Sequence, residues 1–132
     1  MRIRIATIAA ALAVAATSSA ALALSNPLVA QINAIGPNGA HGNVTFFQIE
    51  QSVNVGINLT SDPSGSQALD LRKGTCKSYA GTARWPLGSF DGASDQRKLP
   101  NTKLASIVGN VLLIHKSPDD ASPVIGCAEV KG

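Results

Sequence analysis

The sequence has 132 residues, of which 45% are hydrophobic and 14% are charged, and its formal net charge is +3 at pH 7. Two of its 11 basic residues, Arg2 and Arg4, lie within the first four positions, so the rest of the chain is nearly neutral. It has no basic cluster of the kind that nucleic-acid-binding proteins carry, so we do not expect a nucleic acid as a partner.

The first element along the chain is an apolar N-terminal segment. A short basic start is followed by an uncharged, Ala-rich stretch, and Ala21 and Ala23 fit the small-residue rule for cleavage. We therefore predict a signal peptide over residues 1–23 and a periplasmic or secreted protein with no membrane span after cleavage. The alternative is a retained transmembrane anchor, because the stretch is almost long enough to span a bilayer. The remaining residues suffice for one domain and not for two.

Residues 24–41 contain several turn-forming pairs, and we interpret them as an N-terminal arm with one possible strand near residues 29–35. Two segments of alternating polarity follow. Residues 42–50 are rich in β-formers, and residues 52–59 have an apolar side chain at every second position. Each segment predicts a strand with one buried face and one exposed face.

The middle of the chain contains one further alternating segment and a long stretch without clear pattern. Residues 68–72 predict a strand that carries Leu69 and Leu71 on one face. Residues 77–100 are predicted to be a long, mostly irregular loop, of the kind that is functional or tied down in compact domains. Its apolar side chains would attach it to the sheet, and these are Trp85, Leu87 and Phe90.

The C-terminal pattern consists of two short apolar segments around a turn-rich loop. Residues 111–114 lead into His115, residues 116–123 are rich in proline and aspartate, and residues 124–130 return through Cys127. Both segments are short and contain β-branched residues, which predicts paired strands. No segment combines a helical period, a cap and sufficient length. The whole pattern therefore predicts an all-β fold, a Greek-key sandwich or barrel.

The two cysteines, Cys76 and Cys127, are predicted to form a structural disulfide, because export favours an oxidising compartment. The alternative is a redox or metal-binding pair. The sequence has no C-x-x-C motif, and no second soft ligand lies beside either cysteine.

Taken together, these segments resemble the copper/zinc superoxide dismutase family. The resemblance covers residues 42–131, nearly the whole mature chain, and implies that family's Greek-key barrel, with one disulfide, over a domain of residues 42–132. It begins with Gly42-x-Val44-x-Phe46-x-Gln48 and ends with His115, Asp119-Asp120 and Cys127 in the family's order.

The chain departs from that family at the metal ligands. The resemblance implies copper held by a His-x-His strand, by a loop histidine and by the histidine of a later strand, but here Leu69 and Leu71 stand at the His-x-His positions. The three zinc histidines are also missing, and His115 alone remains of the copper set, with His41 as a possible weak second ligand. Two imidazoles make a poor copper site. We therefore expect no cofactor, and copper is the less favoured alternative.

We expect a catalytically inactive domain, a pseudoenzyme that binds an unknown protein or small molecule. The expected binding face comprises Leu69, Leu71, Tyr79, Trp85 and His115. Strand alternation would turn Asp70 away from that face. His115 itself is interpreted as a strand-end histidine that bonds to backbone or aspartate neighbours. The alternative function is a residual superoxide dismutase or a weak copper-binding protein that uses His115.

Overall fold

The structure is a computed structural model, and it describes residues 24–61 and 65–132. The predicted signal peptide, residues 1–23, lies outside the described residues. Within the described part of the chain, no helix has the length and hydrophobicity needed to cross a membrane.

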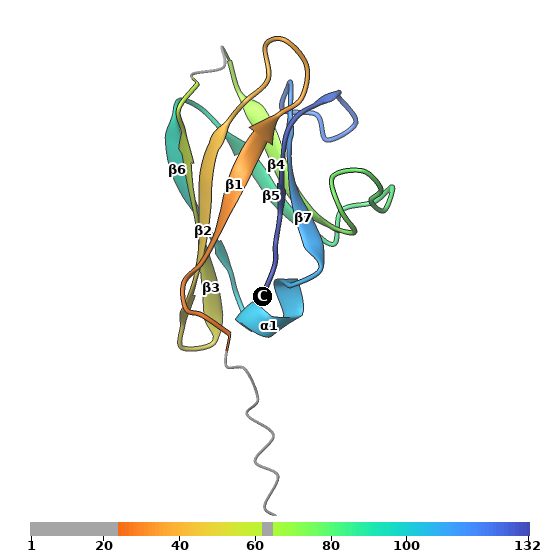
Figure 1. Cartoon of the computed structure of the whole chain (residues 1–132). Coiled ribbons are helices and arrows are strands. Elements are labelled where there is room, and N and C mark those ends of the chain that lie inside the picture. Colours follow the sequence, from red (N-terminus) through yellow and green to blue (C-terminus); the bar gives the residue numbers. More distant parts are fainter. Residues whose placement is uncertain (1–23, 62–64) are drawn as a thin grey trace, which may run out of the picture.

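The described residues form one antiparallel sheet that curves into a nearly closed barrel (Figure 1). Its eight strands follow the spatial order β5-β4-β7-β8-β1-β2-β3-β6. The predicted all-β class is therefore confirmed. The elements in chain order are β1 (Leu28–Ala34), β2 (Gly42–Ile49), β3 (Ser52–Leu59), β4 (Gln67–Lys73), β5 (Trp85–Phe90), β6 (Ser94–Leu99), α1 (Leu104–Ile107), β7 (Asn110–His115) and β8 (Val124–Glu129).

Strands β2 and β3 follow from their alternating sequences. Their apolar side chains, among them Val44, Phe46 and Val55, are completely buried in the barrel interior, whereas the residues between them face outward. Burial of such side chains is the main stabilising contribution of the fold. The two strands predicted over residues 42–50 and 52–59 are confirmed.

Strand β1 is an integral part of the sheet. It pairs with β2 through residues 28–32 and with β8 through Asn33 and Ala34. The strand predicted near residues 29–35 is therefore present. The segment that we expected to be an arm lies within the sheet, between β2 and β8.

Strands β4 and β7 lie side by side and are buried on both faces. One face packs into the barrel core, and the other is covered by residues 74–84, which follow β4, and by residues 116–123, which follow β7. A strand buried on both faces reads as an almost continuous apolar run, as residues 111–114 do.

The prediction of an irregular loop over residues 77–100 is wrong, because this range contains β5 and β6. Pro86 and Gly88 interrupt the alternating pattern by which β5 could be recognised in the sequence. Both residues are tolerated there because β5 is an edge strand. The register between β4 and β5 shifts at Leu87, and Gly88 has a φ of 76°, in the left-handed region that glycine favours. This bulge allows Leu87 and Phe90 to be buried together although they are three residues apart.

The side chain of Arg97 connects the two edge strands, β5 and β6, which form no backbone pairing with each other. β5 and β6 are connected by the short turn 91–93, but neither strand is paired with the other. The guanidinium of Arg97 donates from Nε to the carbonyl oxygen of Leu87 at 3.1 Å and from Nη2 to the carbonyl oxygen of Ser89. Its Nη1 lies 2.8 Å from Oδ2 of Asp95. Arg97 thus connects the two edges of the sheet, β5 and β6, across the open seam of the barrel.

Replacement of Arg97 by alanine is expected to lower the free energy of unfolding by about 1–2 kcal/mol, because two carbonyl groups of β5 lose a charged donor. Amide hydrogen exchange in β5 and β6 should accelerate more than in β2. Lys98→Ala is the matched control, since Lys98 is exposed on the same strand. Equal exchange in the two variants would contradict a connecting role for Arg97.

Candidate functional site

Three polar residues share the outer face of β4 and β7. On β4, Asp70 and Arg72 alternate with Leu69 and Leu71, and they pair with Leu113 and Val111 of β7. His115, at the end of β7, lies on the same face as Asp70 and contacts it. Leu69 and Leu71 point into the barrel core and are fully buried there. The prediction that these leucines share a face with His115 is therefore wrong, and so is the prediction that Asp70 points away from it.

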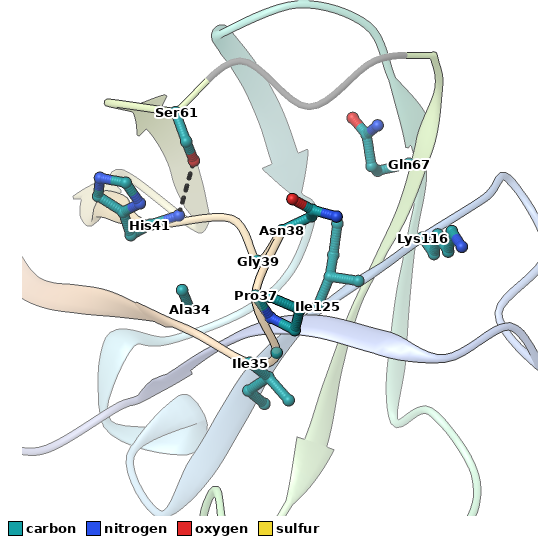
Figure 2. Close-up of a pocket in the computed structure, with 11 residues that line it drawn as sticks. Ala34, Ile35, Pro37, Asn38, Gly39, His41, Ser61, Gln67, Lys116 and Ile125 are labelled. Atoms are coloured by element: carbon teal, nitrogen blue, oxygen red, sulfur yellow. Dashed lines mark hydrogen bonds between the residues drawn. The ribbon is translucent and has the colours of Figure 1, made fainter.

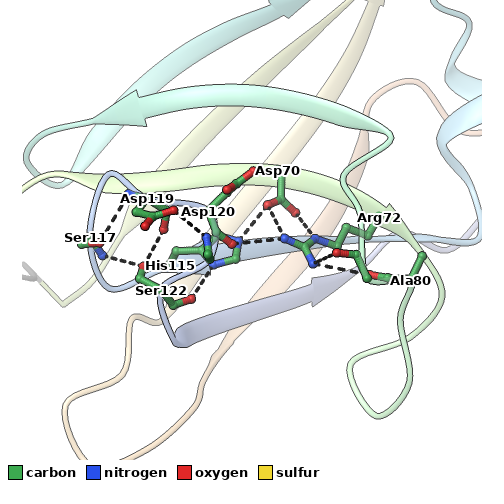
Figure 3. A network of polar contacts seen from close by, with 10 residues as sticks. Asp70, Arg72, Ala80, His115, Ser117, Asp119, Asp120 and Ser122 are labelled. Atoms are coloured by element: carbon green, nitrogen blue, oxygen red, sulfur yellow. Dashed lines mark hydrogen bonds and ion pairs between the residues drawn. The ribbon is translucent and has the colours of Figure 1, made fainter.

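The carboxylate of Asp70 lies between the guanidinium of Arg72 and the imidazole of His115 (Figure 3). Arg72 donates from Nε to Oδ1 at 2.9 Å and from Nη2 to Oδ2 at 3.1 Å, and Nε2 of His115 lies 2.7 Å from Oδ2. Asp70 and His115 are each only 1% exposed. A charged group this deeply buried persists only when it is paired and hydrogen-bonded.

Both ring nitrogens of His115 face oxygen acceptors. Nδ1 lies 2.9 Å from the carbonyl oxygen of Ser122, and Nε2 faces the Asp70 carboxylate. A ring nitrogen that carries a proton donates it to the oxygen that it faces. The hydrogen bond from Asp70 raises the pKa of the Arg72 guanidinium above its ordinary value, although burial opposes this. Arg72 is therefore a permanent cation.

The remaining donors of this network hold the two covering loops. Nη1 of Arg72 donates to the carbonyl oxygens of Ala80 at 3.4 Å and Gly81 at 3.1 Å, and Nη2 donates to that of Asp120 at 3.3 Å. The guanidinium also lies 5.9 Å from the centre of the Tyr79 ring, within cation–π range. One buried ionic cluster thus fixes residues 74–84 and residues 116–123 relative to each other.

An open groove of about 620 Å³ runs between these two loops. Arg72 and His115 lie at its base, and Tyr79, which is 38% exposed, lies on one wall. Trp85 does not border it: this ring packs against the core and lies under the guanidinium of Arg84 at 4.5 Å. The groove is lined by Arg72, Tyr79, Gly81, Thr82, Ala83, Pro86, His115, Asp120, Ala121, Ser122, Pro123 and Val124.

The predicted disulfide between Cys76 and Cys127 is confirmed, with 5.9 Å between the Cα atoms. It joins the loop after β4 to strand β8. Cys127 is buried beside Val111 and Leu113 in a small cluster on the outer face of the sheet. The same loop that carries Tyr79 is therefore held at one end by Cys76 and at the other by Arg72.

The carboxylate of Glu129 also helps to hold the Cys76 end of this loop against β8. Its Oε1 accepts a hydrogen bond from the backbone N–H of Cys76 at 3.0 Å, and its Oε2 lies 3.3 Å from Nζ of Lys131. These contacts, the Cys76 bond first, lower the pKa of Glu129 from its ordinary value.

Because the folded-state pKa of Glu129 is lowered, its contribution to stability is present above the unfolded-state pKa and is lost as the pH falls through the folded-state value. Glu129→Gln is therefore expected to unfold more easily than the wild type near neutral pH. The difference in free energy of unfolding should shrink in acid, as measured by urea titrations across pH 2–7. A difference that stays constant over this range would contradict the proposed role of the carboxylate.

His41, the possible second ligand, lies away from His115. It borders a separate hollow of about 850 Å³ that involves the β1–β2 connection, Lys116 and Ile125 (Figure 2). Its backbone N–H donates to Oγ of Ser61 at 3.0 Å. The two histidines line different hollows. Among the residues that the structure describes, no three His, Cys, Asp or Glu side chains come together in a way that could hold a metal ion.

Sequence reasoning identified His115 and Tyr79 but missed Asp70 and Arg72. The available indication was the pattern of β4 itself, in which two ionisable residues alternate with two leucines. A pattern of this kind in a strand whose two faces are both covered requires the charged residues to find partners on the outer face.

Comparison with known proteins assigns no family to this chain. No family model matches the sequence, and no curated protein matches it significantly. What the chain does must therefore be inferred from the residues and the geometry described above.

Proposed function

We propose that this chain is an exported domain of the copper/zinc superoxide dismutase type that does not catalyse dismutation and acts as a binding module. Its binding site is the groove between residues 74–84 and residues 116–123. The domain requires no metal for this role. An exported location is compatible with the Cys76–Cys127 disulfide, since disulfides persist in oxidising compartments.

The strand order supports the proposed fold type. Strand β4 pairs with β5, the chain continues through the turn 91–93 into β6, and β7 then returns to pair with β4. Apart from the unpaired step between β5 and β6, this is the order of a Greek key. The proposed resemblance over residues 42–131 is consistent with this topology.

The observation that carries the proposal is the environment of His115. At the position where the resemblance implies a copper ligand, both ring nitrogens are engaged, one by Asp70 and one by the carbonyl oxygen of Ser122. The cluster uses its remaining hydrogen bonds to hold the walls of the groove. Walls that are fixed before binding lower the entropic cost of holding a ligand.

Metal analysis tests the non-catalytic part of the proposal. The protein is purified from an expression host that exports it, and copper and zinc are then measured before and after incubation with copper sulfate. We expect substoichiometric metal and no superoxide turnover above that of free copper at the same concentration. One tightly held equivalent of copper together with turnover would refute the proposal.

Site-specific photo-crosslinking tests the binding part. A benzophenone amino acid is placed at Tyr79 or Thr82 on the groove, and at Ala105 on α1 as an exposed control. We expect cross-linked products from the groove positions in intact cells and none from position 105. Products from all three positions, or from none, would contradict a specific groove. N-terminal sequencing of the exported protein, expected to begin at Leu24, tests the cleavage site.

A further inference from the structure

The outer face of β1, β2, β3 and β6 is a broad surface of neutral polar side chains, distinct from the groove. The four strands are neighbours in the sheet, and alternation places one set of side chains from each strand on this face. Among the described residues of these strands, Lys98 is the only charged one in that set. The amides and hydroxyls on this face are Gln31, Asn33, Asn43, Thr45, Ser52, Asn54, Asn58, Ser94 and Gln96.

The strand registers arrange these side chains in rows across the sheet. One row contains Gln31, Asn43, Asn58 and Ser94, because each of these residues is paired directly with the next. Directly paired side chains lie within about 4.5–5.5 Å of one another at their Cβ atoms, so one ligand can contact several of them. Each amide supplies both donors and an acceptor.

A hollow lies in the middle of this face at Gly56. This glycine pairs with Thr45 on one side and with Gln96 on the other, and the missing side chain leaves a depression of about 490 Å³. A Cβ atom added at Gly56 would meet nothing closer than the carbonyl oxygen of Thr45 at 3.9 Å. The hollow is bordered by Thr45, Gly56, Ile57, Asn58, Ser94, Asp95 and Gln96. The one ionisable residue among them, Asp95, has its carboxylate paired with Arg97.

An exposed aromatic ring stands beside the hollow. Phe47 follows Thr45 on the same face of β2, is 41% exposed and pairs with Asn54. Ile49 and Val29 are also exposed on this face. An aromatic ring offers an apolar surface on which the C–H face of a sugar ring can stack, while the surrounding polar groups fix its orientation.

We propose that this face binds a neutral oligosaccharide, with one sugar in the hollow at Gly56 and its neighbour on the ring of Phe47. Every hydroxyl of a sugar both donates and accepts hydrogen bonds, as the amides of Gln96 and Asn58 do. The near absence of charge within this set of outward side chains disfavours an anionic polymer. A second copy of the chain is a poorer occupant, because a homodimer interface would bury these amides, whereas such interfaces are more apolar than the ordinary protein surface.

The test is a titration of the ¹⁵N-labelled, full exported protein with cellohexaose, laminarihexaose and chitohexaose, and with hexagalacturonate as the anionic comparison. We expect at least one neutral sugar to shift backbone amide resonances of β2, β3 and β6. Phe47→Ala and Gly56→Val should each weaken that binding by about tenfold or more. Gly56→Val fills the hollow at a position with ordinary backbone conformation and raises strand propensity, so the variant should stay folded.

Tyr79→Ala is the matched control, because Tyr79 is an equally exposed aromatic residue that lies on the groove. It should leave the oligosaccharide affinity unchanged. The experiment therefore distinguishes binding at the groove from binding at this face, and either proposal can be contradicted without the other. The proposal is overturned if none of the neutral sugars binds at millimolar concentration, if hexagalacturonate binds more tightly, or if Gly56→Val binds as the wild type does. It is also overturned if sedimentation shows a dimer that Phe47→Ala dissociates.

Discussion

Replacement of Asp70 by alanine is expected to lower the free energy of unfolding by about 3–5 kcal/mol. Among the residues that the structure describes, Asp70 is the one side-chain anion in contact with both Arg72 and His115, and it is 1% exposed. Its removal leaves a permanent guanidinium without its counter-charge, on a side chain that is only 10% exposed. An uncompensated buried charge costs far more than the pair itself contributes to stability.

Urea unfolding followed by circular dichroism measures this effect, and Asp95→Ala is its matched control. Asp95 is also paired with an arginine on a strand, but both partners are nearly one-third exposed, and we expect a loss of about 0–1 kcal/mol for such a pair. A triple variant, Asp70→Leu with Arg72→Met and His115→Leu, should recover part of the stability that Asp70→Ala loses, because no charge remains buried. Similar losses of unfolding free energy for Asp70→Ala and Asp95→Ala would show that water screens the charges of the cluster and would contradict this prediction.

Removal of the disulfide in the Cys76→Ala, Cys127→Ala double variant is expected to cost about 4 kcal/mol, because the bridge closes a loop of some fifty residues in the unfolded chain. The loss should be accompanied by faster amide exchange in residues 74–84, since Cys76 anchors this loop to β8. Alanine is chosen because Cys127 is buried and a serine hydroxyl would need a partner there.

Reduction provides the control for this variant. The oxidised and reduced forms of the wild type should differ in free energy of unfolding by about as much as the wild type and the double variant do. The double variant itself should not respond to the reductant. A double variant within about 1 kcal/mol of the oxidised wild type would contradict the calculation from loop entropy.

The strands of the barrel were predictable where one face is buried and the other exposed. Residues 52–59 alternate without interruption, and β3 spans the same range. β5 and β6 were not predictable in this way. Strand β5 contains a proline, a glycine and a bulge, and β6 has one buried residue, Leu99. The single turn α1 is too short to show a helical period.

At the site, the sequence indicated which histidine mattered and what it would contact. The interpretation that His115 bonds to backbone and aspartate neighbours agrees with its contacts to Ser122 and Asp70. The sequence did not indicate which aspartate, because the parity of β4 relative to β7 depends on the pairing register. The leucines were assigned to the outer face by a resemblance in sequence, whereas burial in the barrel assigns them to the core.

The two free edges of the sheet also bear on how the protein behaves at high concentration. A barrel whose last two strands do not pair exposes backbone groups that could recruit a strand from another molecule. Here one edge, β5, contains Pro86, which has no N–H to offer, and the other, β6, carries Asp95, Arg97 and Lys98 within six residues. Imino-acid and charged side chains of this kind discourage fibrous association, so the open seam need not become a point of self-assembly.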